Sequence, residues 1–431
     1  MSPAPDHVEG DLGMPRQVDV VVIGGGIIGC ASALELAQKG LRVALCEKGR
    51  IAGEQSSRNW GFCRQQGRDP AELPLIVESM RRWRRMSETL GEDIGYRPTG
   101  CLYVADDDAQ EADFRAWLEH AQIHQLDSRM IGRAEIDDLV PGANGRFSRA
   151  LYTASDGRAE PTCAAPAMAR AAQRMGVHIL TNCAVRGLDF HAGQVASVVT
   201  ERGVIAARAV VGAGGVWSEL FCARHGLDLP QVETESSVMR TGPAPEVFAG
   251  ALWTRGFACR RRLDGGYTIA NGGSSLCPLT PRNFRHMGKF WKNYKKERKR
   301  LRLSLGKRFF EDMATPRDWP LHGPSPFEKT RVLDPQPYTP ILDDALANIQ
   351  AAFPELNDVE IVERWAGRID VTPDAVPVIG PAPDVPGFYV ASGFSGHGFG
   401  IGPGAGRLVA DLVAGDHPIV DPTPFRFERF H

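Results

Sequence analysis

The chain has 431 residues, of which 43% are hydrophobic and 24% charged, so it can bury the core of a globular protein with two or three domains. Its formal net charge is −2, which argues against a nucleic acid as the partner of the whole protein. The longest apolar stretch, residues 18–37, is interrupted by polar residues, so we expect no transmembrane helix. Residues 1–16 lack a basic start followed by an apolar run and predict a flexible N-terminal arm on a cytoplasmic protein.

The nine cysteines are scattered without a CxxC pair. An odd number of cysteines in a chain of this size favours reduced thiols over a disulfide framework. Histidines and cysteines do not cluster at the spacing of a metal site, so we expect no metal.

A strand, a glycine turn and a helix follow one another near the N-terminus. Residues 18–23 are a β-branched run, and residues 30–39 have the composition of a helix. The turn between them reads Gly24, Gly25, Gly26, Ile27, Ile28 and Gly29. We expect Gly24 to make the turn, Gly26 to let a pyrophosphate approach the backbone, and Gly29 to permit close packing of helix on strand.

A second strand, residues 41–46, ends at the acidic residue Glu47. Glu47 lies 23 positions after Gly24, close to the spacing at which a carboxylate accepts hydrogen bonds from ribose hydroxyls. The motif therefore predicts binding of FAD or NAD rather than NADP.

Later segments offer further contacts to a diphosphate and return the chain to the same sheet. Residues 53–61 form a small, polar stretch able to donate hydrogen bonds to a diphosphate, residues 184–188 predict a strand, and residues 209–218 predict a strand that ends in a second glycine turn. Near the C-terminus a strand over residues 387–391 and a glycine-rich loop lead into a helix over residues 404–414.

With these motifs the chain resembles the D-amino acid oxidase superfamily of FAD enzymes, which includes glycine oxidase and sarcosine oxidases. The residues that carry the resemblance are Gly24, Gly26, Gly29 and Glu47, the strand at Val185, residues 213–217, residues 372–380 and residues 393–399. It implies an α/β fold with a discontinuous Rossmann-like FAD-binding domain and a substrate domain built on an antiparallel sheet with helices. We assign residues 17–95, 150–232 and 356–431 to the FAD domain, and residues 96–149 and 233–355 to the substrate domain.

The resemblance also implies which residues contact the flavin. They are Gly24, Gly26, Ile27, Ile28, Gly29, Glu47, Ser56, Ser57, Val185, Gly214, Trp217, Gly396, His397, Gly398 and Phe399. Sarcosine oxidases attach the flavin to a cysteine shortly before the segment that corresponds to Thr372, and this chain has no cysteine there, so we predict non-covalent FAD.

Arginines are the expected ligands of a substrate carboxylate, because a guanidinium matches it with two parallel hydrogen bonds. Arg64 follows the polar stretch, Arg262 lies with Arg260 on one face of a hairpin predicted over residues 257–270, and Arg368 precedes Thr372. We expect each of the three to be a candidate catalytic residue, although Arg368 could instead pair with Asp370 and Arg64 with a nearby acid.

Each of three other side chains has two possible roles. The resemblance places His397 beside the flavin, where it could act on flavin or substrate or serve as a structural hydrogen-bonding residue. Trp253 and Tyr267 could line the pocket or belong to the core.

Residues 285–308 contain eleven basic residues and one acidic residue, with apolar side chains at near-helical spacing. They predict an amphipathic basic helix or helix pair. Such a surface could be a solvated face, a docking site for an acidic partner or a membrane surface, or a device that steers an anionic substrate.

The chemistry implied by the resemblance is hydride transfer from the carbon that carries nitrogen to flavin N5, followed by hydrolysis of the imine. We predict oxidation of a small amino acid, an N-methyl amino acid or an aminophosphonate, with O₂ or another compound as electron acceptor. The alternatives are a dehydrogenase that passes electrons to a quinone or a protein, and a non-catalytic flavin-binding subunit of a larger complex.

Overall fold

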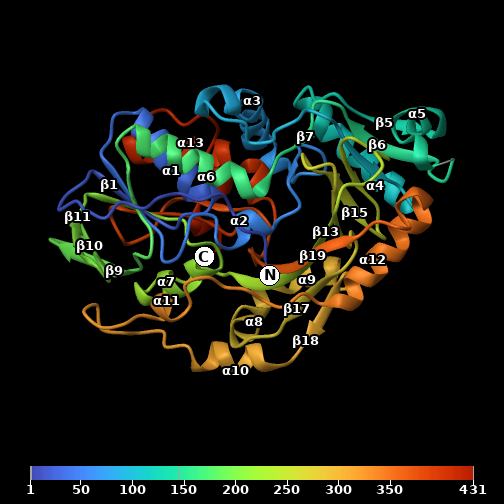
Figure 1. The fold of residues 1–431 in the computed structure, drawn as a ribbon. Coiled ribbons are helices and arrows are strands. Elements are labelled where there is room, and N and C mark those ends of the chain that lie inside the picture. Colours follow the sequence, from blue (N-terminus) through green and yellow to red (C-terminus); the bar gives the residue numbers. More distant parts are fainter. Residues whose placement is uncertain (1, 144, 431) are drawn as a thin grey trace.

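The computed structural model describes residues 2–143 and 145–430 (Figure 1). These residues build two large sheets, one of six strands and one of ten, with helices packed around them. The predicted α/β class with a second, antiparallel sheet is confirmed.

The six-stranded sheet has the order β20-β21-β12-β1-β2-β8, and all neighbours in it are parallel except β20 and β21. Its strands are β1 (Val20–Ile23), β2 (Val43–Cys46), β8 (His178–Leu180), β12 (Ala209–Gly212), β20 (Val378–Pro381) and β21 (Phe388–Ser392). The glycine turn after β1 therefore lies at the carboxyl edge of the central strand, where parallel sheets bind nucleotides.

Both faces of this sheet are buried, because successive side chains of a strand point to opposite sides. Val20 and Val22 join a core shared with helices, whereas Val21 joins a core on the other face. The helices are α1 (Ile27–Gln38), α3 (Leu73–Leu90), α6 (Pro161–Arg174) and α13 (Gly398–Ala414), seen together in Figure 1. The other face is covered by β9 (Val185–His191), β10 (Gln194–Thr200), β11 (Gly203–Ala206) and α7 (Ser218–Arg224).

The ten-stranded sheet is antiparallel except at the β4–β14 and β17–β18 pairs. It consists of β4 (Cys101–Val104), β5 (Ser128–Gly132), β6 (Arg149–Thr153), β13 (Val232–Thr241), β14 (Ala251–Trp253), β15 (Ala258–Arg261), β16 (Tyr267–Ala270), β17 (Ser275–Pro278), β18 (Leu301–Ser304) and β19 (Ile361–Val371). Helices α4 (Asp108–Ile123), α5 (Arg133–Leu139) and α12 (Thr339–Ala352) lie beside it (Figure 1).

Two strands differ from the residue ranges that we assigned from the sequence. Most of β6 and all of β19 lie in ranges assigned to the FAD domain, yet both pair within the ten-stranded sheet. β19 pairs with β13 along nearly its whole length. No short-range pattern in the sequence indicates this long-range pairing. The predicted hairpin over residues 257–270 is confirmed by antiparallel pairing of β15 with β16.

The basic stretch at residues 285–308 is only partly helical, which corrects the prediction of a helix or helix pair. Around it α8 (Pro281–Arg285) and α9 (Met287–Glu297) are followed by β18 and then by α10 (Lys307–Ala314). Residues 301–304 form a strand because their backbone pairs in parallel with β17.

The N-terminal segment, which the sequence predicts to be a flexible arm, lies along α6 and β8. The amide of Asp6 donates to the carbonyl of Thr162 at 2.9 Å, and the amide of Asp11 donates to that of Ile179 at 2.7 Å. Among the described residues no helix combines the length and the apolar character that crossing a membrane requires.

Candidate active site

A continuous cavity of about 1760 Å³ connects the two sheets. It begins at the glycine turn before α1, passes the end of β19 and the loop before α13, and reaches the ten-stranded sheet and α9. One site can therefore hold an extended cofactor and place its far end against a substrate.

Glycine is required at the three motif positions for different structural reasons. Gly24 has φ +109°, and a Cβ there would lie 2.5 Å from the carbonyl oxygen of Ala213; a Cβ at Gly29 would lie 1.9 Å from the carbonyl oxygen of Gly24. Gly26 has an ordinary φ of −75°, and a Cβ there would meet only the Ser56 hydroxyl, at 3.0 Å. The glycine at position 26 thus leaves space on the cavity side, as close approach of a pyrophosphate requires.

Polar groups around this turn match the parts of a dinucleotide. The Ile27 amide, at the N-terminus of α1, donates to the Ser56 hydroxyl at 2.8 Å, and that helix end attracts anions. The Glu47 carboxylate accepts hydrogen bonds of 2.7 Å from the amides of Gly25 and Gly49. Burial raises the pKa of Glu47, although these amides and the charge of Lys48 oppose that shift. The residues present therefore fit a bound FAD, with a carboxylate at the expected ribose position.

A buried polar network fixes the middle of the cavity. Gln55, in α2 (Gln55–Arg58), donates to Asp370 Oδ1 at 2.8 Å and accepts from the Val216 amide at 3.0 Å. Asp370 Oδ2 accepts from the Gly393 amide at 2.7 Å. The second glycine turn, the end of β19 and the loop before α13 are thereby held together, and sequence reasoning did not identify Gln55.

Most residues that the resemblance assigned to the flavin line this cavity. They are Gly24, Gly26, Ile27, Ile28, Glu47, Ser56, Val185, Gly214, Trp217, Gly396, His397, Gly398 and Phe399. Gly29 and Ser57 are not among the lining residues: Gly29 packs against Gly24, and the Ser57 hydroxyl donates to the Glu54 carbonyl at 3.3 Å.

His397 precedes α13 and contacts a buried carboxylate. Its Nδ1 lies 3.0 Å from Oε2 of Glu72, whose side chain is fully buried. Burial would raise the pKa of Glu72, but the charges of His397 and Arg68 outweigh it and lower that pKa. Burial lowers the pKa of His397. Glu72 therefore orients the imidazole at the cavity wall.

Arg64 lines the cavity, and a second arginine, Arg68, lines it too. The Arg64 guanidinium lies over the ring of Tyr103, 5.3 Å from its centroid. Arg68 is 3% exposed, and its Nη1 has no hydrogen-bond partner among the described residues. Burial, assisted by the charge of Arg64, lowers the pKa of Arg68 to about 10. Sequence reasoning missed Arg68, because only the fold shows that its guanidinium is buried in the cavity wall without a direct ion pair among the described residues.

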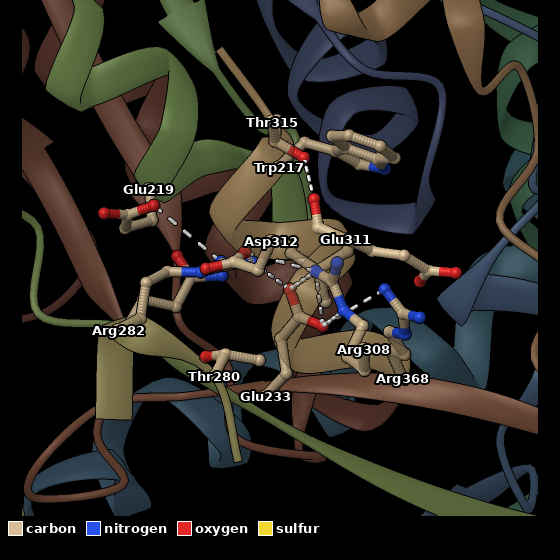
Figure 2. A network of polar contacts seen from close by, with 12 residues as sticks. Trp217, Glu219, Glu233, Thr280, Arg282, Arg308, Glu311, Asp312, Thr315 and Arg368 are labelled. Carbon is tan, nitrogen blue, oxygen red and sulfur yellow. Dashed lines mark hydrogen bonds and ion pairs between the residues drawn. The ribbon is translucent and has the colours of Figure 1, made fainter. Parts of the chain in front are cut away.

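Arg368 also lines the cavity, but two carboxylates occupy its guanidinium. Nη1 lies 3.2 Å from Glu233 and Nε lies 3.2 Å from Glu235. Figure 2 shows Glu233 surrounded by Arg368, Arg282 and Arg308. The expected alternative partner of Arg368, Asp370, is instead hydrogen-bonded to Gln55.

The structure does not bring Arg262 to the cavity, in contrast to our expectation. The Arg262 Nε donates to Asp264 at 3.0 Å at the hairpin turn. Its neighbour Arg260 is 1% exposed and forms a bidentate pair with Glu160, at 2.8 and 3.1 Å. Both arginines have carboxylate partners within the chain, so neither is free to bind a substrate.

Aromatic side chains line the substrate side of the cavity. They are Trp60, Phe62, Tyr103, Phe114 and Trp253. The rings of Tyr103 and Trp253 lie 5.0 Å apart, and the indole of Trp253 donates to the carbonyl of Gly272 at 3.0 Å. Tyr267 is a core residue, since it is fully buried and its hydroxyl accepts from the Val247 amide at 2.9 Å.

The glycine turn, the ribose carboxylate and a cavity that ends at an antiparallel sheet define a dinucleotide-dependent oxidoreductase with its substrate site between two sheets. A family model described as "FAD dependent oxidoreductase", DAO, matches residues 19–412. The chain belongs to this family and is an FAD-dependent amine or amino acid oxidoreductase.

Several known proteins are similar over nearly the whole chain. Glycine oxidase of Pseudomonas aeruginosa is 27% identical over 416 residues, which cover 94% of this chain and 97% of that protein. Human mitochondrial sarcosine dehydrogenase is 25% identical and matches 97% of this chain, which spans 42% of that longer relative. The solved structure of L-amino acid deaminase from Proteus myxofaciens in complex with anthranilate superposes with a TM-score of 0.96 at 32% identity, covering 100% of this chain and 97% of that one.

Proposed function

We propose that the protein oxidises the carbon–nitrogen bond of an α-amino acid with a large apolar or aromatic side chain. FAD would be held without a covalent bond by the glycine turn, Glu47 and the loop before α13, and when bound it supplies a hydride acceptor for the α-carbon. The imine product then hydrolyses in water.

The observation that carries this proposal is the buried guanidinium of Arg68 in the cavity wall: its Nε donates to the Arg64 carbonyl at 3.2 Å, but its Nη1 has no hydrogen-bond partner and it forms no ion pair among the described residues. A buried cation without a direct ion pair is costly, and the adjacent positive charge of Arg64 adds to the cost, although the charge of Glu72 offsets part of it. A substrate carboxylate between Arg64 and Arg68 would satisfy both charges with charge-assisted hydrogen bonds. If the amino group of the substrate is neutral, no separate base is needed before the α-carbon gives up its hydride.

The walls of the same region favour an apolar side chain on the substrate. Tyr103 and Trp253 present ring surfaces at the cavity, and such surfaces contribute strongly to the burial of flat apolar groups. The deaminase structure with TM-score 0.96 contains anthranilate, which is an aromatic carboxylate. Both points support an aromatic amino acid over glycine or an aminophosphonate.

The test is anaerobic titration of the purified holoprotein with a panel of L- and D-amino acids, N-methyl amino acids and aminophosphonates. We expect bleaching of the flavin absorbance by aromatic or large apolar amino acids, and at least tenfold weaker apparent affinity for glycine. Bleaching by glycine or sarcosine in preference to phenylalanine would contradict the proposed substrate. If bound flavin responded to no amine, the non-catalytic subunit would become the better account.

A second candidate concerns the acceptor: a dehydrogenase that passes electrons to a quinone or a partner protein instead of O₂. It is supported by α9, whose Phe290, Trp291 and Tyr294 line the cavity while its lysines are exposed. Peroxide formed when air is readmitted to the bleached protein would identify an oxidase, whereas reoxidation by a quinone or dye alone would identify a dehydrogenase. The nine free cysteine thiols support a reducing compartment, the cytoplasm, for this reaction.

A further inference from the structure

Exposed apolar side chains are concentrated in one short part of the chain. Residues 281–314, here called the basic segment, comprise α8, α9, β18 and α10. They contain seven of the fifteen large hydrophobic side chains that are exposed among the described residues. Helices α9 and α10, both described in full, contain no buried residue. An exposed apolar patch of this kind indicates a surface that another molecule or a membrane covers.

The apolar residues of each helix share a side. Met287 and Trp291 are four positions apart in α9 and are 58% and 50% exposed. Phe310 and Met313 are three positions apart in α10 and are 61% and 62% exposed. The ring of Phe284, which is 57% exposed, lies 6.2 Å from that of Phe309 and connects α8 to α10.

The charges of the basic segment are strongly one-sided. Residues 285–308 contain eleven basic residues and one acidic residue. Five of the basic residues form no ion pair within residues 2–143 and 145–430, and they follow one another closely: Lys292, Lys295, Lys296, Arg298 and Lys299. The Lys295 ammonium lies 5.3 Å from the ring centroid of Trp291, so free cations and exposed apolar side chains occupy the same surface.

The segment is firmly attached to the rest of the molecule on its other side. Arg282 is 5% exposed and lies 2.6 Å from both Glu233 and Asp312, and Arg308 lies 3.0 Å from Glu233 (Figure 2). In Figure 1, α10 runs along the outer edge of the molecule. The buried ion pairs therefore fix a framework that presents Phe310, Met313, Lys295 and Lys299 outward, while Trp291 is half exposed and also lines the cavity.

We infer that the basic segment binds the surface of an anionic lipid bilayer. Aromatic and methionine side chains would enter the boundary between headgroups and acyl chains, while the unpaired lysines contact lipid phosphates. A purely electrostatic partner, such as a nucleic acid or an acidic protein, does not account for the interleaved exposed apolar side chains. Because α9 also lines the cavity, the bound face would lie next to the site.

The direct test is sedimentation of the FAD-loaded protein with lipid vesicles. We expect at least tenfold stronger partitioning into vesicles of phosphatidylcholine with phosphatidylglycerol than into phosphatidylcholine alone, and weaker binding at high salt. Absence of binding to phosphatidylglycerol vesicles overturns the inference. The measurement does not depend on the substrate, so its failure would leave the proposed oxidation untouched.

Two pairs of variants separate the two kinds of contact. Lys295→Glu with Lys299→Glu should reduce vesicle binding at least tenfold, whereas Arg85→Glu with Arg208→Glu, an equal charge change elsewhere on the exposed surface, should not. Phe310→Ser with Met313→Ser should also reduce it, whereas Ile123→Ser with Met175→Ser should not. Flavin absorbance and thermal midpoint confirm folding of each variant. Full vesicle binding by the Phe310 and Met313 variant would overturn insertion into lipid, because charge alone would then account for the binding.

Discussion

Gly26 and Gly132 offer a matched comparison at the scale of single residues. Each precedes a helix in extended backbone, with φ −75° and ψ 179° at Gly26 and φ −99° and ψ 179° at Gly132. A Cβ at Gly132 would meet nothing within 4 Å, and one at Gly26 would meet only Ser56. Gly26→Val should therefore fold but weaken FAD binding at least tenfold, because its side chain fills the position of the pyrophosphate. Flavin absorbance after gel filtration measures retention.

Gly132→Val is the control, and it should retain FAD as the unmodified protein does. Equal flavin content in the two variants would show that the pyrophosphate does not approach residue 26.

Arg68→Met tests the proposed carboxylate site. Loss of a charge-assisted hydrogen bond costs about 1.5–3 kcal/mol, so we expect KM to rise by about tenfold to a hundredfold with a smaller change in kcat. Arg262→Met is the control, because Arg262 pairs with Asp264 outside the cavity, and its kinetics should be unchanged. A raised KM for Arg262→Met with an unchanged KM for Arg68→Met would instead place the carboxylate site at the hairpin. Steady-state kinetics with an aromatic amino acid measure both constants.

At the scale of elements, Glu233 attaches α8 and α10 to β13. Glu233→Gln removes the one buried carboxylate that contacts all three of Arg282, Arg308 and Arg368, and loss of one partner of a buried pair costs about 3–5 kcal/mol. We expect faster hydrogen exchange in residues 281–314 and a lower thermal midpoint. Glu135→Gln, which breaks an exposed pair with Arg129, should change neither.

The same carboxylate predicts a pH dependence of stability. Burial would raise its pKa, but the charges of Arg282, Arg308 and Arg368 lower the pKa of Glu233 to about 2, below the ordinary 4.5. Its contribution is therefore complete above pH 4.5 and is lost as the pH falls towards 2. The difference in thermal midpoint between the unmodified protein and Glu233→Gln should shrink over this interval. A constant difference down to pH 2 would contradict the assignment.

For the molecule as a whole, the pair between Arg260 and Glu160 connects the ten-stranded sheet to helix α6, which packs on the six-stranded sheet. Arg260 is on β15, Glu160 immediately precedes α6, and Arg260 Nε also donates to the carbonyl of Trp60 at 2.7 Å. Arg260→Leu leaves the buried Glu160 without its ion-pair partner and should destabilise the protein by about 3–5 kcal/mol. This would be seen as a lower unfolding midpoint in urea. Arg262→Leu should have little effect. Equal unfolding midpoints for Arg260→Leu and the unmodified protein would mean that this pair does not stabilise the contact between the ten-stranded sheet and α6.

Local patterns predicted the dinucleotide part of the fold well. The β-branched run before Gly24, the glycines and Glu47 are short-range features, since each acts on backbone within a few residues or on an adjacent strand. The hairpin at β15 and β16 was predictable for the same reason. β18 was not, because it is a strand only through pairing with β17, and its basic composition resembles that of the preceding helix.

Sequence motifs were enough to predict the cofactor-binding turn, the class of enzyme through resemblance, and a set of candidate arginines. Which arginine lacks a carboxylate partner depends on the tertiary structure. Arg262 and Arg368 have carboxylate partners, Arg262 within the hairpin turn and Arg368 across two paired strands, while Arg68 is buried in the cavity wall without one. The physical reason is that a charge is available to a ligand only where its other neighbours leave it uncompensated, and those neighbours come from distant parts of the chain.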